Sequence, residues 1–281
     1  MGTDSSPTLH RRRLARRLRQ MREKANMTIA EAAPKLDKTK SALGRIETGE
    51  TGADIHLVRT MMDVYDQYDK HLPDLVRAAM QPAWWTPYGI RDRGFLGLET
   101  DADEEWDSSL SYVPGLLQTE EYMRAVFSNG RLKRSPKQLE GQVGARLFRQ
   151  GRLTAKESPL TFAAIIDESA LRKPTGGREV MRDQLKHLIE ATELATVTIQ
   201  VLPDELGSHP GLDGAFTVLE FEDPEDPSLL YVEYPTGAIH VEKTEEVTDA
   251  KLLFSKLRSL ALSPAETVEF IRRVGQRRYS L

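Results

Sequence analysis

The chain has 281 residues, 39% of them apolar and 29% charged, which is typical of a globular protein with two domains. It contains no cysteine, which excludes disulfides, zinc–thiolate sites and thiol nucleophiles and is typical of proteins in a reducing compartment. Its net charge is −4, and neither a run of about 18 apolar residues nor a secretory signal is visible, so we expect a cytoplasmic protein outside the membrane.

The charge is unevenly distributed along the chain. Residues 9–48 hold twelve Lys and Arg against four Asp and Glu. Residues 1–80 hold fifteen against eleven, which leaves the remaining 201 residues with a net charge of −8. A basic N-terminal part on an acidic body suggests a polyanionic partner for the N-terminal part alone. A solvated arginine-rich helix without a partner would give the same pattern.

Short helices are predicted to follow one another over residues 9–80, after a polar tail, residues 1–8, that we expect to be disordered. The first helix has one apolar face, because its apolar residues recur at i, i+4 and i+7. These residues are Leu14, Leu18 and Met21. The next three helices each follow a predicted capping residue, and these caps are Thr28, Thr39 and Asp54. With a fifth helix near residue 75, the pattern predicts an all-α domain.

The rest of the chain mixes both periodicities. Residues 81–94 are rich in Pro, Gly and aromatic residues and are interpreted as a linker, and the acidic run at residues 99–107 is interpreted as solvated surface. Strands are predicted at residues 160–167, 196–203, 215–221 and 229–235. Helices are predicted at residues 111–127, 137–154, 177–194, 244–262 and 263–275. Residues 95–281 are therefore predicted to form a larger α+β domain with a mostly antiparallel or mixed sheet.

The stretch "LDKTKSALGRIETG", residues 36–49, has the composition of a turn followed by a helix with two different faces. Leu43 and Ile46 face inward, whereas the opposite stripe is polar or small and consists of Lys40, Ser41, Gly44, Arg45 and Thr48. Small residues allow a helix backbone to approach the major groove of DNA, and long basic side chains reach base edges or phosphates. A mid-helix glycine costs about 1 kcal/mol relative to alanine, which a purely structural helix would not repay. The alternative is a five-helix bundle without a ligand.

This stretch resembles the Cro/C1-type (XRE-family) DNA-binding domain. The resemblance runs from about Leu9 to Met80 and is strongest in "MTIAEAAPKLDKTKSALGRIETG". It implies a recognition helix at about residues 39–48 in the major groove and an ion pair between Arg22 and Glu47. The candidate DNA-binding residues are Thr28, Thr39, Lys40, Ser41, Gly44, Arg45, Arg16 and Arg17. The sequence departs from the family pattern at Ile29, Pro34 and Gly44.

The second region resembles the DUF5753 domain found in many actinobacterial regulators. The motifs that carry the resemblance are "YVPGLLQTEEYMRAVF", "ARLFRQGRL", "IIDESALR", "QLKHLIEAT", "IQVLP", "GAFTVLEF" and "LYVEY", in this order over roughly residues 95–275. The resemblance implies a transcriptional regulator, often encoded beside a small DUF397-type partner protein. The candidate partner or ligand residues are Tyr112, Pro114, Leu117, Trp84 and Trp85. Packing explains the "VPGLLQT" residues as well as a binding groove does, and the tryptophans fit either a domain anchor or a binding surface.

No pattern in the sequence predicts an enzyme, a cofactor or a metal site. His209, with Asp213 four residues later, is the one suggestive cluster, and it is interpreted as part of an irregular loop. The "TGGR" sequence at residues 175–178 opens a helix and could hold an anion, although plain helix entry explains it equally.

The sequence as a whole predicts a homodimeric, sequence-specific transcriptional regulator that binds double-stranded DNA. Its C-terminal domain is expected to mediate dimerisation and to bind an effector or a partner. Dimerisation is expected because one recognition helix reads only about half of a site. One alternative is an antitoxin-like protein that holds a small DUF397-type partner and uses DNA binding for autoregulation. A second is a C-terminal enzyme domain whose activity is gated by DNA.

Overall fold

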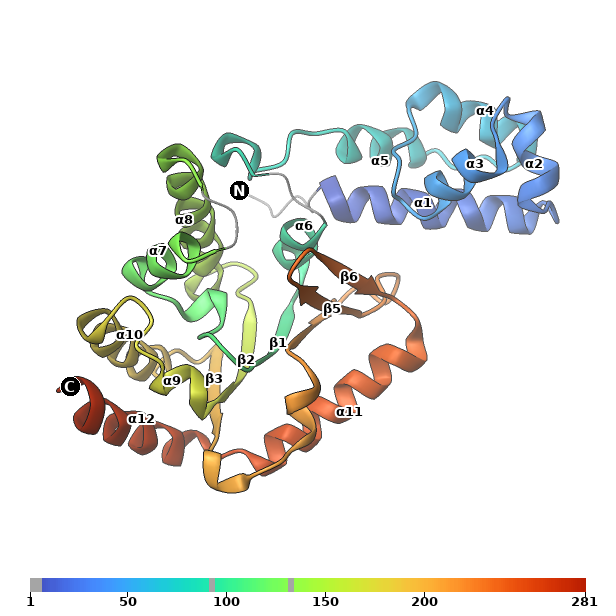
Figure 1. Ribbon diagram of the computed structural model, residues 1–281. Coiled ribbons are helices and arrows are strands. Elements are labelled where there is room, and N and C mark those ends of the chain that lie inside the picture. The colour runs from blue at the N-terminus through green and yellow to red at the C-terminus, as the bar shows by residue number, and fades with distance from the viewer. Residues whose placement is uncertain (1–6, 91–93, 131–133) are drawn as a thin grey trace. The chain divides into compact units, whose positions relative to one another are not determined.

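The computed structural model describes residues 7–90, 94–130 and 134–281 (Figure 1). The chain forms two compact units. The first contains Met1–Trp84 and Gly94–Asp101, and the second contains Trp85–Arg93 and Ala102–Leu281. The predicted linker at residues 81–94 is therefore divided between the two units, and its residues 91–93 lie outside the described residues.

The first unit is helical. Its helices are α1 (Pro7–Lys24), α2 (Ile29–Lys35), α3 (Lys40–Glu47), α4 (Ile55–Tyr65), α5 (Leu72–Ala79) and α6 (Phe95–Asp101). Helix α1 begins at Pro7, so the last two residues of the expected disordered tail are helical, whereas residues 1–6 lie outside the described part. The predicted caps Thr28, Thr39 and Asp54 each accept a hydrogen bond from a first-turn backbone N–H. Local sequence therefore sets where α2, α3 and α4 begin.

One apolar core holds α1 to α5 together. The predicted face of α1 is buried, with Leu14, Leu18 and Met21 at most 7% exposed. Residues from α2, α3, α4 and α5 complete this core, among them Ala32, Leu43, Met61 and Val76. Helix α6 was not predicted; it packs against α1, and Trp84 Nε1 donates to Thr100 Oγ1 at 2.9 Å.

The second unit contains a six-stranded mixed sheet in the order β3-β2-β1-β4-β5-β6. The strands are β1 (Glu104–Ser109), β2 (Thr161–Asp167), β3 (Val197–Leu202), β4 (Phe216–Glu220), β5 (Leu229–Tyr234) and β6 (Gly237–Val241). Strands β1, β2 and β3 are parallel, whereas β4, β5 and β6 join the sheet through antiparallel pairing. The predicted α+β class with a mixed sheet is confirmed.

Strand β1 corrects the sequence-based interpretation of the acidic run. Residues 99–107 were expected to be solvated surface, but β1 lies inside the sheet and pairs with β2 on one side and β4 on the other. Glu105 and Ser108 are each only 2% exposed. The error arose because the strand sequence "EEWDSS" carries no apolar alternation, although its backbone is hydrogen-bonded on both sides.

Helices cover the sheet and close its β3 edge. They are α7 (Glu120–Ser128), α8 (Pro136–Gln150), α9 (Glu168–Arg172), α10 (Arg178–Ala191), α11 (Thr244–Leu260) and α12 (Pro264–Tyr279). Phe254 and Leu257 of α11 pack on Phe216 and Val218 of the sheet. At the free edge of β3, Val201 O accepts from Leu262 N at 2.9 Å and Val201 N donates to Thr267 Oγ1 at 3.1 Å. The junction between α11 and α12 therefore covers this edge and fixes the start of α12.

Part of the predicted linker packs within the second unit. The 3₁₀ turn η1 (Thr86–Tyr88) lies against α8. A Cβ atom added at Gly141 would lie 2.1 Å from the Tyr88 carbonyl oxygen, and one added at Gly144 would lie 2.9 Å from the Tyr88 ring. The two glycines thus leave a groove on α8 that Tyr88 fills, a contact that the sequence pattern did not reveal.

Candidate nucleic-acid interface

The helix-turn-helix geometry is built by α2, a tight turn and α3. Helix α2 ends at Lys35, and Asp37 in the turn has a φ of +52°, a conformation that Asp tolerates better than most residues. Leu43 and Ile46 of α3 are 0% and 5% exposed and lie in the same core as Ala32. This burial fixes which face of α3 points outward.

The outward face of α3 carries the predicted contact residues. Lys40, Ser41, Arg45 and Thr48 are exposed, and Gly44 is half-exposed. A Cβ atom added at Gly44 would meet no atom within 4 Å. Within the described residues, neither Lys40 nor Arg45 has an ion-pair partner, so both cations are available to an external anion.

Thr28 and Thr39, both predicted to bind DNA, are exposed, and each also caps a helix. Thr28 Oγ1 accepts from Glu31 N at 3.3 Å and Glu31 Oε2 accepts from Thr28 N at 2.9 Å, which forms the capping box. Thr39 Oγ1 accepts from Ala42 N at 3.1 Å. Ile29, at the first position of α2, packs against the core instead of presenting a polar group.

Arg22 and Glu47 tie α1 to the end of α3. Arg22 Nε donates to Glu47 Oε1 at 2.7 Å and a terminal nitrogen donates to Oε2 at 2.8 Å, and the two side chains are 8% and 3% exposed. The remaining terminal nitrogen of Arg22 donates to the Met27 carbonyl at 2.7 Å. This hydrogen bonding to Glu47 raises the pKa of Arg22. Burial raises the pKa of the neighbouring Tyr65 to about 12, so the phenol stays neutral beside the pair.

The arginines of α1 occupy different environments. Arg17 is exposed, Arg16 is half-buried, and Arg12 is 7% exposed and thus withdrawn from the surface. Arg19 is exposed and pairs with Glu23 at 2.8 Å on the same helix. Of the two α1 residues predicted to contact DNA, Arg17 is therefore the more accessible.

The "VPGLLQT" motif of the second unit is held mainly by internal contacts. Leu116 and Leu117 are buried in the 3₁₀ turn η2 (Gly115–Leu117). Gln184 of α10 is fully buried, donates to the Leu117 carbonyl at 2.7 Å and accepts from Thr119 N at 2.8 Å. The burial of Gln184 was not predicted, because a polar residue within a helix is normally solvated.

A cavity of about 440 Å³ lies beside this motif. Tyr112 and Pro114 line it, whereas Leu117 does not. Arg146 of α8 also lines the cavity, where it donates to Gln118 Oε1 at 2.6 Å and lies over the Phe127 ring at 4.4 Å. The structure thus brings two of the five candidate ligand residues to one cavity.

The other singled-out residues are dispersed. Trp85 is buried and Trp84 is half-buried. His209 is buried with its Nε2 3.4 Å from Asp167 Oδ2, whereas Asp213 is exposed. Over residues 7–90, 94–130 and 134–281, no group of three His, Asp or Glu side chains is arranged to hold a metal ion. Within the same ranges, no helix is long and apolar enough to cross a bilayer.

Comparison with known families finds two matches along the chain, and the second includes α6, which packs in the first unit. Residues 13–75 match the model of a helix-turn-helix domain, a class of fold that binds DNA. Residues 92–273 match the model of a domain of unknown function, DUF5753, and the chain belongs to this family. No curated protein and no solved structure shows significant similarity to the chain.

Proposed function

We propose that the protein is a sequence-specific transcriptional regulator of the Cro/C1 type whose helix α3 enters the major groove. The observation that carries the proposal is the outward face of α3, where Lys40, Ser41 and Arg45 surround an open backbone at Gly44. A helix with this face can approach base edges closely while its basic side chains contact guanine or phosphate. We assign the chain no enzymatic reaction.

Gly44 separates this function from a five-helix bundle without a ligand. A glycine inside a helix is required structurally when a neighbour would clash with a side chain, and no atom lies within 4 Å of the added Cβ position. Internal packing therefore gives no reason for its cost in helix stability. The close approach of an external surface to the helix backbone gives a reason for this cost.

We further propose that the protein acts as a homodimer and that the DUF5753 unit supplies the dimer contact and regulation. One recognition helix covers only half of a typical operator, so two copies are needed for affinity and specificity. The net charge of −8 over residues 81–281 repels DNA, which argues against a second nucleic-acid clamp.

The test is to select genomic DNA fragments with the intact protein and to measure its affinity for the enriched sequence and for random DNA. Arg45→Ala should weaken binding to the selected site by about 1–3 kcal/mol and should weaken random binding less. The matched control is Arg77→Ala, which removes an exposed arginine of α5 that pairs with Asp74.

Arg77→Ala should leave both affinities unchanged. If Arg45→Ala lost the same affinity for both DNAs, Arg45 would contact only phosphate and would not read the bases. Unchanged binding would refute the assignment of α3 as the recognition helix.

A further inference from the structure

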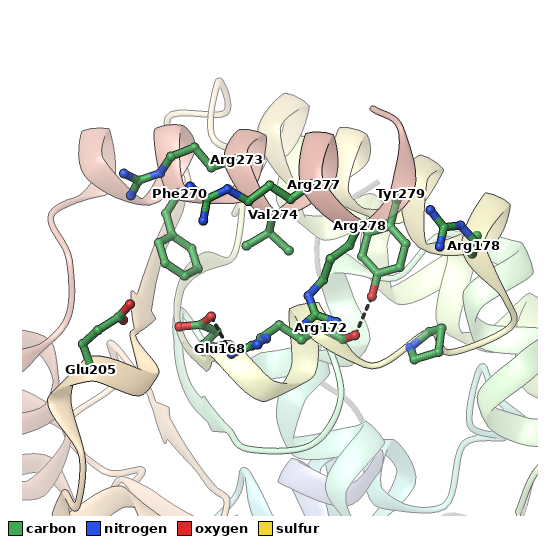
Figure 2. Close-up of a pocket in the computed structure, with 11 residues that line it drawn as sticks. Glu168, Arg172, Arg178, Glu205, Phe270, Arg273, Val274, Arg277, Arg278 and Tyr279 are labelled. Carbon is green, nitrogen blue, oxygen red and sulfur yellow. Dashed lines mark hydrogen bonds and ion pairs between the residues drawn. The ribbon is translucent and has the colours of Figure 1, made fainter.

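A cavity of about 910 Å³ in the second unit is lined by five arginines and two glutamates. It lies between α9, the start of α10 and the last turns of α12 (Figure 2). This positive lining is unexpected, because residues 81–281 as a whole carry a charge of −8. A concentration of arginines against the overall charge of its domain needs a local explanation.

The charges inside the cavity are largely uncompensated. Arg172 pairs with both Glu168, at 3.2 Å, and Asp204, so its charge is already neutralised. The other four arginines make no ion pair with any described residue, and they are Arg178, Arg273, Arg277 and Arg278. Glu205 is the one remaining acid in the lining, which leaves a clear excess of positive charge.

Helix-end stabilisation explains only part of this cluster. Arg277 and Arg278 lie in the last turn of α12, where cations offset the helix dipole of about half a charge. Arg273 lies one turn earlier, and Arg178 belongs to another helix. Arg178 is the first residue of α10, whose N-cap Gly177 makes no side-chain capping bond, so this end adds further positive potential.

The cavity also has an apolar wall. Phe270 and Val274 point from α12 toward α9, as Figure 2 shows, and the Arg273 guanidinium lies 5.7 Å from the Phe270 ring centre. Tyr279 is buried, and its hydroxyl donates to the Arg172 carbonyl at 2.7 Å, which joins the end of α12 to α9. The volume falls within the range of about 300–1,000 Å³ that is common for small-ligand pockets.

We propose that this cavity binds a small organic polyphosphate, with the phosphates held by Arg273 and Arg277 and the organic part against Phe270 and Val274, whereas Arg178 lies at the other end of the cavity (Figure 2). A single carboxylate would leave most of the guanidiniums without a counter-charge. A di- or triphosphate presents several adjacent anionic oxygens, which match the paired donors of arginine. If the ligand regulates DNA binding, that role rests on the proposed function. Binding of the ligand to the cavity does not depend on it.

The test is calorimetric titration of the intact protein, without DNA, with ATP, inorganic pyrophosphate and adenosine in about 150 mM salt. We expect one molecule of ATP or pyrophosphate per chain, tighter binding of ATP, and no binding of adenosine. Arg277→Ala and Arg273→Ala should each weaken ATP binding by about tenfold or more. Both side chains are exposed, so the variants should fold, and their thermal unfolding without ligand checks this.

Two controls isolate the cavity. Arg272→Ala removes a neighbouring α12 arginine that pairs with Glu269 at 2.6 Å and does not line the cavity, and it should change the affinity by less than about twofold. Arg45→Ala removes a cation of the candidate DNA interface and should leave ATP binding intact. A loss in either control as large as that in Arg277→Ala would overturn the proposal, as would no binding of ATP or equal binding of ATP and pyrophosphate.

The outcome is independent of the DNA measurements. A protein that binds its selected DNA but not ATP would retain the proposed function and lose this site. A protein that binds ATP through Arg277 but shows no DNA preference would retain the site and lose the proposed function.

Discussion

Gly44 lies in the middle of α3, with its α-carbon on the face that points away from the core. The buried residues on either side in the sequence, Leu43 and Ile46, hold the helix in place, so Gly44 itself contributes little to packing. At this position the requirements of helix stability and of close approach to a ligand oppose each other. A single substitution can therefore separate them.

Gly44→Ala should stabilise the isolated fold and weaken DNA binding. The added methyl group meets no atom of the chain, and alanine favours a helix over glycine by about 0.5–1 kcal/mol. Chemical unfolding should show this gain, while affinity for the selected DNA should fall because the methyl group holds the backbone away from the groove. A gain in stability with unchanged affinity would mean that α3 does not approach DNA at this point.

The Arg22–Glu47 pair is the second residue-scale feature that links the sequence to stability. Glu47→Ala would leave the buried Arg22 guanidinium with the Met27 carbonyl as its hydrogen-bond acceptor and with the exposed Glu23 carboxylate 3.8 Å away. The free energy of unfolding of the first unit should fall by about 3–5 kcal/mol. Arg19→Ala, which breaks the exposed pair with Glu23 and leaves Arg22 and Glu47 in place, should cost less than about 1 kcal/mol. Equal losses in urea titrations of the two variants would contradict the buried role of Glu47.

At the scale of elements, α1 combines a structural face with a charged one. Leu14 and Leu18 lie in the core, and the arginines around them differ in exposure. Buried Arg12 cannot reach a phosphate without leaving its position, whereas Arg17 can. The count of arginines in the sequence thus overstates the number of charges that α1 offers to DNA.

Replacing both Arg16 and Arg17 with alanine should flatten the dependence of DNA binding on salt. If both side chains touch phosphates, the slope of log affinity against log salt concentration should fall by roughly two units, and by about one if only Arg17 does. Binding of the intact protein and the variant at several salt concentrations measures this slope. An unchanged slope would place both arginines outside the interface.

At the scale of the whole molecule, the chain passes between the two units more than once. Residues 85–90 belong to the second unit, and α6 returns to the first before β1 begins. A cut at residue 80 would therefore remove α6, which packs on α1 and accepts the Trp84 hydrogen bond. The helical unit extends to Asp101.

A fragment of residues 1–101 should unfold at a higher temperature than one of residues 1–80. It should also bind the selected DNA about 100-fold more weakly than the intact protein, because the second unit is proposed to join two copies. Light scattering should find the fragment monomeric and the intact protein dimeric. A monomeric fragment that binds as tightly as the intact protein would contradict dimerisation through the DUF5753 unit.

The sequence by itself determined helices α1 to α5 of the first unit, the caps of α2, α3 and α4, and the outward face of α3. Thr28, Thr39 and Asp54 each bond to a backbone N–H at most three residues away, and Leu43 and Ile46 follow helical periodicity. Their roles can therefore be predicted from the neighbouring sequence alone. The strands of "TFAAIID" and "VTIQVL" were equally visible because buried strands are apolar.

Only the tertiary structure decided the features that join distant residues. Polar β1 lies within the sheet because β2 and β4 satisfy its backbone, and Gln184 is buried because it bonds to a turn more than sixty residues away. The arginine cavity unites residue 178 with residues 273–278 across two helices. No local pattern records such pairs, because their hydrogen bonds and electric fields arise only when separate elements come together.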